Sequence, residues 1–141
     1  MEVQINLLSV LIAAIASMVA GFIYYSPVVV GKPWMKLMGF TEKSMKEAQK
    51  KMGPMYALSF VAALVTAYVL AHFVALADYF YGIDPMATAL TTAFFAWLGF
   101  VMPAQLTDVI FGNKIVKLFA INTGYQLVSL LAMGVVIGLM Y

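Results

Sequence analysis

The side chains in this sequence best suited to chemistry are a carboxylate, a lysine and several amides near its last connection. Asp108 and Lys117 lie at similar distances on either side of residues 112–113, and Gln105 and Asn122 lie about one helical turn further away. If the flanking segments form an antiparallel helical hairpin, Asp108 pairs with Lys117 near the membrane surface. The two amides then pair deeper in the membrane.

Two further residues extend this polar cluster along the last apolar segment. Gln126 and Ser129 follow Asn122 at spacings of four and seven residues, which places all three on one helix face. Pro103 lacks a backbone donor and is expected to bend its helix beside the cluster.

Two interpretations of this polar cluster stay open. The polar groups satisfy one another and hold the helices in register, or they line a cavity that binds a polar headgroup, a cation or a small amphiphile.

The sequence contains no recognisable catalytic, metal or cofactor site. It has no Cys and a single His, His72, so a metal site would have to be built mainly from carboxylates. Asp108 has no His at a spacing typical of an acid–base pair, and no glycine-rich phosphate loop is present. We therefore expect no enzymatic activity, no metal and no cofactor. For His72 we expect a hydrogen bond to Asn6, Ser9 or another helix.

The elements that carry these side chains are predicted from long apolar runs. Of the 141 residues, 65% are hydrophobic and 10% are charged, which is too little polar surface for a water-soluble protein. Spanning the hydrocarbon layer takes roughly 20 helical residues. The runs of that length are residues 5–25, 55–77, 86–111 and 115–140. They predict an all-α fold, a single domain over residues 1–141 with four transmembrane helices in one bundle.

The distribution of lysine predicts the orientation in the membrane. All eight basic residues are Lys: six lie between the first and second spans, and Lys114 and Lys117 flank the third connection. Short loops rich in Lys stay in the cytoplasm, so both connections should lie inside. We therefore expect a multi-pass protein of the cytoplasmic (inner) membrane with both chain termini outside. Asp78 and Asp84 then mark the outer loop.

The cytoplasmic segment, residues 26–53, should contain a short amphipathic helix. At its start are residues expected to end the first span: Pro27, Gly31 and Pro33. Aromatic side chains suited to the headgroup layer flank them: Tyr24, Tyr25 and Trp34. From Thr41, a predicted N-cap, Lys and Glu alternate on a helix that we expect to lie on the lipid surface. A docking site for a cytosolic partner is the alternative, and the absence of Arg speaks against nucleic acid.

Small residues predict faces where helices approach closely. Gly21 ends such a face on the first span, and Gly134 with Gly138 forms a GxxxG motif on the last. This packing can occur within one subunit or between subunits. A homo-oligomer or a partner in a membrane complex therefore stays open beside the lipid bilayer itself.

Three sequence blocks resemble a known family: Gly21-Phe-Ile-Tyr-Tyr-Ser-Pro27, Gly31-Lys-Pro-Trp-Met-Lys36 and Asn122-Thr-Gly-Tyr125. The chain resembles, over nearly its whole length, the small bacterial and archaeal membrane proteins catalogued as domain of unknown function 1761. The resemblance implies a four-helix membrane protein and brings no activity. It also makes the following residues candidates for a shared site: Tyr24, Tyr25, Ser26, Pro27, Gly31, Lys32 and Trp34.

These observations favour a membrane protein that binds or carries a lipid or a small amphiphilic or cationic ligand between its helices in the cytoplasmic half. The alternative is a structural or accessory subunit that packs against another membrane complex or itself. A drug-exporter-like transporter is less favoured, because such proteins resemble one another in a carboxylate within the first span. Here that span has none after Glu2.

Overall fold

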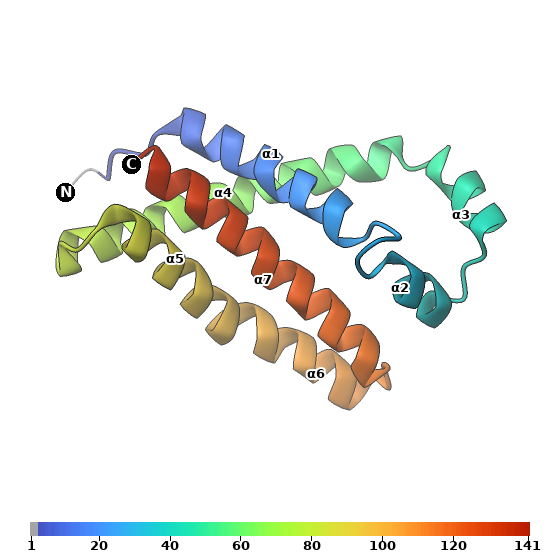
Figure 1. Ribbon diagram of the computed structural model, residues 1–141. Coiled ribbons are helices and arrows are strands. Elements are labelled where there is room, and N and C mark those ends of the chain that lie inside the picture. Colours follow the sequence, from blue (N-terminus) through green and yellow to red (C-terminus); the bar gives the residue numbers. More distant parts are fainter. Residues whose placement is uncertain (1–2) are drawn as a thin grey trace.

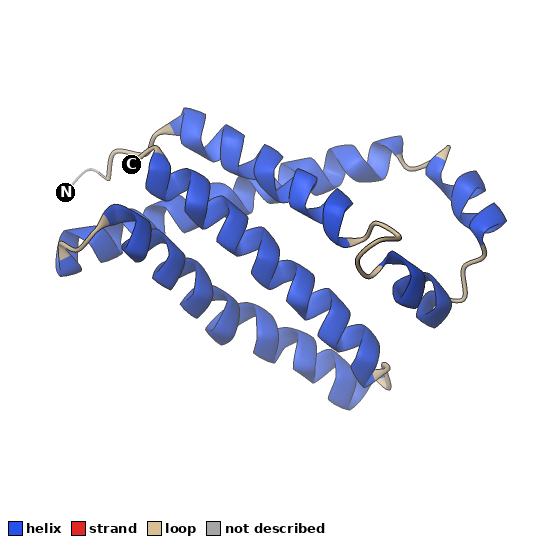
Figure 2. Cartoon of the chain, in the orientation of Figure 1, coloured by secondary structure: helices blue, strands red, loops and turns tan. Residues whose placement is uncertain are grey.

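The computed structural model describes residues 3–141, which form helices and no strand (Figures 1 and 2). Two short helices lie between the first two long ones, and a π-helical turn, η1, interrupts the third span. The elements in chain order are α1 (Leu7–Tyr24), α2 (Gly31–Met38), α3 (Glu42–Gln49), α4 (Gly53–Tyr81), α5 (Pro85–Ala96), η1 (Trp97–Val101), α6 (Met102–Gly112) and α7 (Val116–Leu139).

Four helical segments are long and apolar enough to cross a membrane: α1, α4, the continuous stretch Pro85–Gly112, and α7. The all-α fold with four spans is thus confirmed, and three spans end within two residues of the predicted bounds. Large apolar side chains such as Ile15, Leu58 and Val65 are exposed on their outer faces. These faces suit contact with lipid chains.

The second span is longer than predicted because Asp78 does not lie in a loop. Its carbonyl accepts a hydrogen bond from the Gly82 N–H at 2.8 Å, so Asp78 belongs to the last turn of α4. The helix ends at Gly82, whose φ of +55° is left-handed. Asp84 does lie in the loop, and its carboxylate caps α5 by accepting from the Ala87 N–H at 2.9 Å.

The segment between α1 and α4 contains two short helices where one was predicted. Thr41 is the N-cap of α3, as expected, and exchanges hydrogen bonds with Ser44. The additional helix, α2, starts at Gly31. Pro33 was expected to end a helix, but it lies in the first turn of α2, where its missing N–H has no helical partner to lose.

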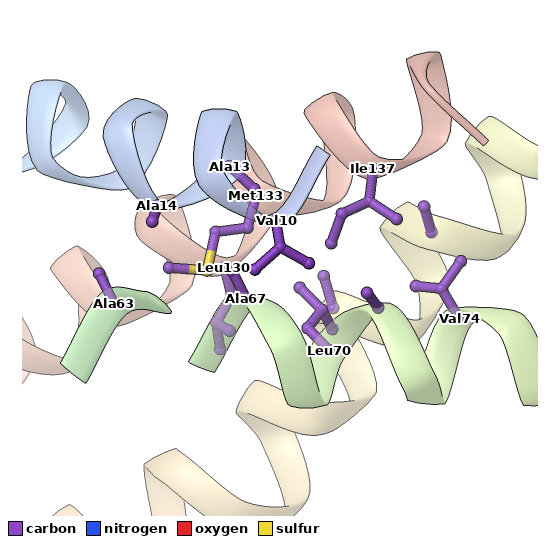
Figure 3. Packing of buried hydrophobic residues seen from close by; sticks show 13 residues of the cluster. Val10, Ala13, Ala14, Ala63, Ala67, Leu70, Val74, Leu130, Met133 and Ile137 are labelled. Carbon is purple, nitrogen blue, oxygen red and sulfur yellow. The ribbon is translucent and has the colours of Figure 1, made fainter. Parts of the chain in front are cut away.

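The long helices converge at the end that holds the chain termini and diverge at the opposite, lysine-rich end (Figure 1). The buried hydrophobic residues follow this geometry: they come from α1, α4, α5 and α7, and none comes from α6 (Figure 3). Most are small or medium-sized, led by Ala13, Ala14, Ala67, Leu70, Val74, Ala89, Ala93, Leu130, Met133 and Ile137. The bundle is therefore closed at one end and open at the other.

The GxxxG motif is used inside the chain, between α7 and α5. A Cβ added at Gly134 would lie 3.1 Å from the Ala89 carbonyl oxygen, and one added at Gly138 would lie 3.0 Å from the Met86 Cα. Both glycines thus allow α5 to approach the α7 backbone. Gly21 serves a different contact, because a Cβ there would lie 3.1 Å from the Tyr125 ring.

The helix that Pro103 was expected to bend contains a π-helical turn, Trp97–Val101, which ends two residues before the proline. Within this turn, the Trp97 indole N–H donates to the Thr123 carbonyl oxygen of α7 at 2.8 Å. Beyond it, α6 buries no residue against the bundle. The third span is therefore held against α7 as far as Trp97, and α6 is only loosely packed.

We expect Gly134→Val to destabilise the bundle by about 1–3 kcal/mol, the usual penalty for overpacking a close contact. The added methyl groups would meet the backbone of α5, which cannot move aside without separating the two helices. Unfolding by SDS in mixed micelles, followed by circular dichroism, measures the change.

Gly99→Val is the matched control, since a Cβ at Gly99 meets nothing within 4 Å. Equal unfolding midpoints for the two variants would contradict the close contact between α5 and α7.

Candidate functional site

Two adjacent tyrosines attach the end of α1 to the second turn of α7. The Tyr24 hydroxyl donates to the Ile121 carbonyl oxygen at 2.9 Å, and the Tyr25 hydroxyl donates to Asn122 Oδ1 at 3.0 Å. Both bonds join residues 97 positions apart in the chain. They place the exit of the first span beside the amide cluster.

Glycines give these tyrosines their space. A Cβ at Gly124 would lie 2.7 Å from the Tyr24 hydroxyl, and a Cβ at Gly31 would collide with the backbone of Tyr25 and Ser26. The start of α2 is therefore folded tightly against the end of α1. This explains why glycine stands at both positions in the blocks that prompted the family resemblance.

A polar pocket of about 340 Å³ lies beside Tyr25, between α6 and α7 at the lysine-rich end. It collects five residues predicted from sequence as ligand-binding candidates: Tyr25, Gln105, Asp108, Asn122 and Gln126. The remaining lining residues are Val109, Lys114, Leu118, Phe119 and Tyr125. The described residues thus form a cavity where the sequence placed its polar cluster.

The predicted partners within this cluster were wrong. Asp108 pairs with Lys114, at 3.0 Å, and Lys117 does not line the pocket. The prediction assumed that the connection turns at residues 112–113, but α7 begins only at Val116, which shifts the facing positions. No hydrogen bond joins Gln105 to Asn122 among the described residues, since the Asn122 oxygen accepts from Tyr25.

A second cavity, which we call the methionine pocket, lies on the other side of Tyr25 and has a volume of about 540 Å³. It is covered by the segment that carries α2 and α3. Its lining is mainly apolar and comprises Met18, Gly21, Phe22, Tyr25, Ser26, Pro27, Trp34, Met35, Met45, Gln49, Met52, Tyr56, Ser59 and Tyr125. Trp34 therefore belongs to this pocket, whereas Tyr24 lines neither.

Tyr25 and Tyr125 line both pockets and form the wall between them. Their ring centroids are 5.1 Å apart, and Trp34 packs on Tyr25 at 5.5 Å. Tyr25 follows the last residue of α1, and burial raises the pKa of its phenol to about 12, with further contributions from Tyr125 and Tyr24. The Tyr25 hydroxyl is therefore a neutral hydrogen-bond donor at physiological pH.

His72 lies outside both pockets and makes a different contact from the one expected. Its Nδ1 lies 2.9 Å from the Tyr68 carbonyl oxygen, one turn earlier in the same helix. Asn6 instead caps α1 and donates to the Met140 carbonyl oxygen at 3.2 Å. Within the described residues, no group of three or more His, Asp or Glu side chains could hold a metal ion.

Sequence reasoning missed Lys114 and Tyr125 as site residues. Tyr125 was present in the third family-like block, but its position relative to α1 depends on tertiary contacts. Lys114 was used only for orientation, because its pairing depends on where α7 begins. The methionines of the methionine pocket carried no signal, since methionine is common in apolar helices of any role.

Residues 8–138 match the family described as protein of unknown function (DUF1761). Comparison with curated proteins and with solved structures gives no match.

We expect Tyr25→Phe to destabilise the protein by about 0.6 kcal/mol and at most about 1.7 kcal/mol, the range for a hydrogen bond between membrane helices. The ring and its packing are kept, while the Asn122 oxygen loses its donor. The SDS unfolding midpoint measures the effect. Tyr79→Phe is the control, because Tyr79 is exposed and its hydroxyl makes no hydrogen bond among the described residues.

From the raised pKa of the Tyr25 hydroxyl we predict that the protein loses stability in alkali. The pKa of Tyr25 is raised in the folded protein. Its contribution to the free energy of unfolding is therefore complete below about pH 10 and is lost as the pH rises through about 12. Tyr25→Phe should flatten the decline in the unfolding midpoint over this interval. An identical decline in both proteins would show that Tyr25 is not the group responsible.

Proposed function

Because the chain belongs to the DUF1761 family, to which no function is assigned, we propose its role from its geometry: it binds or carries a small amphiphile whose polar end lies in the polar pocket. The observation that carries the proposal is a polar cavity between two candidate membrane spans, where two of the three lining amides are not used by the fold. No side-chain hydrogen bond among the described residues involves Gln105 or Gln126, although both line the cavity.

The energetic argument concerns the cost of polar groups in lipid. Amide side chains within a span are unfavourable unless they meet partners, so membrane helices rarely keep them without a role. Here the Asn122 side-chain oxygen accepts from Tyr25, and the amides of Gln105 and Gln126 line the cavity. A ligand with hydrogen-bonding groups would satisfy them.

The open end of the bundle supports access from the membrane surface. The pocket lies beside the connection that carries Lys114, and the Asp108–Lys114 pair at its mouth is 63% and 57% exposed, respectively. Under the positive-inside rule we place this end in the cytoplasmic leaflet of the inner membrane, with both termini outside. The ligand would then enter from that leaflet.

The alternative, an accessory subunit or a homo-oligomer, loses part of its sequence support. Its argument rested on small-residue faces, and the faces at Gly134 and Gly138 are already occupied by α5 of the same chain. The polar pocket, in contrast, has no occupant from the chain itself. Binding of a small amphiphile therefore accounts for more of the observed features than association with another protein does.

We expect the Gln105→Leu/Gln126→Leu double variant to lose most of its bound lipid. The wild-type protein, released from nanodiscs into a native mass spectrometer, should retain one lipid molecule as the collision energy rises. The double variant should release it at lower energy, because its pocket no longer offers donors and acceptors. Losing one or two hydrogen bonds of about 1 kcal/mol each corresponds to roughly a tenfold fall in affinity.

Gln4→Leu, the same substitution at the opposite end of the protein, is the control. Retention by the double variant equal to that of Gln4→Leu, with both proteins folded by circular dichroism, would refute the proposal.

A further inference from the structure

The polar pocket and the methionine pocket share a wall, and this suggests a single site with two ends. Tyr25 and Tyr125 contribute to both linings, and the centroids of their rings are 5.1 Å apart. One side offers amides and charges, and the other offers four methionines and aromatic rings. A molecule with one polar and one apolar end matches this division.

The apolar end fits a flexible hydrocarbon chain. Methionine side chains are unbranched and polarizable, so they adapt to occupants of variable shape. Met18 comes from α1, Met35 from α2 and Met45 from α3, so the first span and both short helices contribute to the pocket. Acyl chains of the surrounding bilayer are the apolar molecules present at that depth.

The polar end carries both signs of charge. Asp108 and Lys114 form an ion pair at the mouth of the pocket, and both side chains are more than half exposed. The rings of Phe119, Tyr25 and Tyr125 complete the lining. A carboxylate beside aromatic rings suits an ammonium group, and a lysine beside amide N–H groups suits a phosphate.

Charge balance then selects the kind of headgroup. An anionic lipid would satisfy Lys114 but would oppose Asp108, and a cationic amphiphile would do the reverse. A zwitterionic headgroup satisfies both residues. Since Asp108 and the amide oxygens are hydrogen-bond acceptors, a primary ammonium, which has three donors, uses them better than a trimethylated one does.

We infer that the protein binds a zwitterionic aminophospholipid across the Tyr25–Tyr125 wall, with its phosphoethanolamine headgroup in the polar pocket and one acyl chain in the methionine pocket. This inference rests on the proposed function and names its ligand class. The exposed ion pair opens when the ligand binds: Asp108 takes the ammonium and Lys114 takes the phosphate.

The test uses the full-length protein in nanodiscs that contain equal amounts of three lipids with identical acyl chains and phosphoethanolamine, phosphocholine or phosphoglycerol headgroups. Native mass spectrometry identifies the lipid that stays bound. We expect phosphoethanolamine to be enriched about tenfold over phosphocholine, as one charge-assisted hydrogen bond predicts. Asp108→Asn should bring this ratio close to one, whereas Asp78→Asn, at the opposite end, should leave it unchanged.

Lys114→Gln should lower the retention of all three lipids without changing the preference for the amine. Lys117→Gln is its matched control, because Lys117 does not line the pocket. A second measurement locates the chain in a Trp97→Phe variant, whose remaining tryptophan is Trp34: brominated acyl chains on the phosphoethanolamine lipid should quench its fluorescence, and Asp108→Asn should weaken this quenching.

Three results would overturn the inference: equal enrichment of the three headgroups, a preference for phosphoglycerol, or an undiminished ratio in Asp108→Asn. The proposed function would still stand in each case, provided that the protein retains lipid. If no lipid of any headgroup is retained by the folded wild-type protein, the proposed function fails as well.

Discussion

Close helix packing at small residues holds this bundle together at the end where the termini lie. Apolar side chains gain little by leaving lipid for a protein interior, so membrane helices depend on close approach of their backbones. Ala13, Ala67 and Ala89 are fully buried in this half, and Gly134 brings α5 against α7. In the lysine-rich half, Gly21 and Gly124 face tyrosine side chains instead of a helix backbone, the long helices diverge, and both pockets lie at that end (Figure 1).

The open half is not without organisation. Side-chain hydrogen bonds to α7 hold its parts in place. The donors are Tyr24, Tyr25 and Trp97; two of them reach the α7 backbone and Tyr25 reaches a side chain. Such bonds are modest individually, but they act on three consecutive residues of one helix, Ile121, Asn122 and Thr123. The bond from Tyr25 holds a residue that both pockets share, and it leaves Gln105 and Gln126 available to an occupant. Ligand sites are usually largely pre-formed and use a few polar groups to orient the ligand.

The sequence predicted the elements better than the contacts between them. Apolar runs of membrane length depend only on local composition, so the four spans and the Thr41 cap were found. The pairing of Asp108 failed because it depends on the exact residue at which α7 begins. The helix α2 was missed because Gly31 and Pro33 are read locally as helix breakers, whereas the packing of Gly31 on Tyr25 makes them a helix start.

The π-helical turn at Trp97–Val101 has a geometric consequence for everything that follows it. Such a turn contains one residue more than an α-helical turn, which rotates the rest of the helix by about 100° about its own axis. Gln105 and Asp108, which line the polar pocket beside α7, lie beyond this turn. Shortening the turn by a single residue would leave the span long enough to cross the bilayer, yet it would turn these two side chains by the same angle away from the pocket residues of α7.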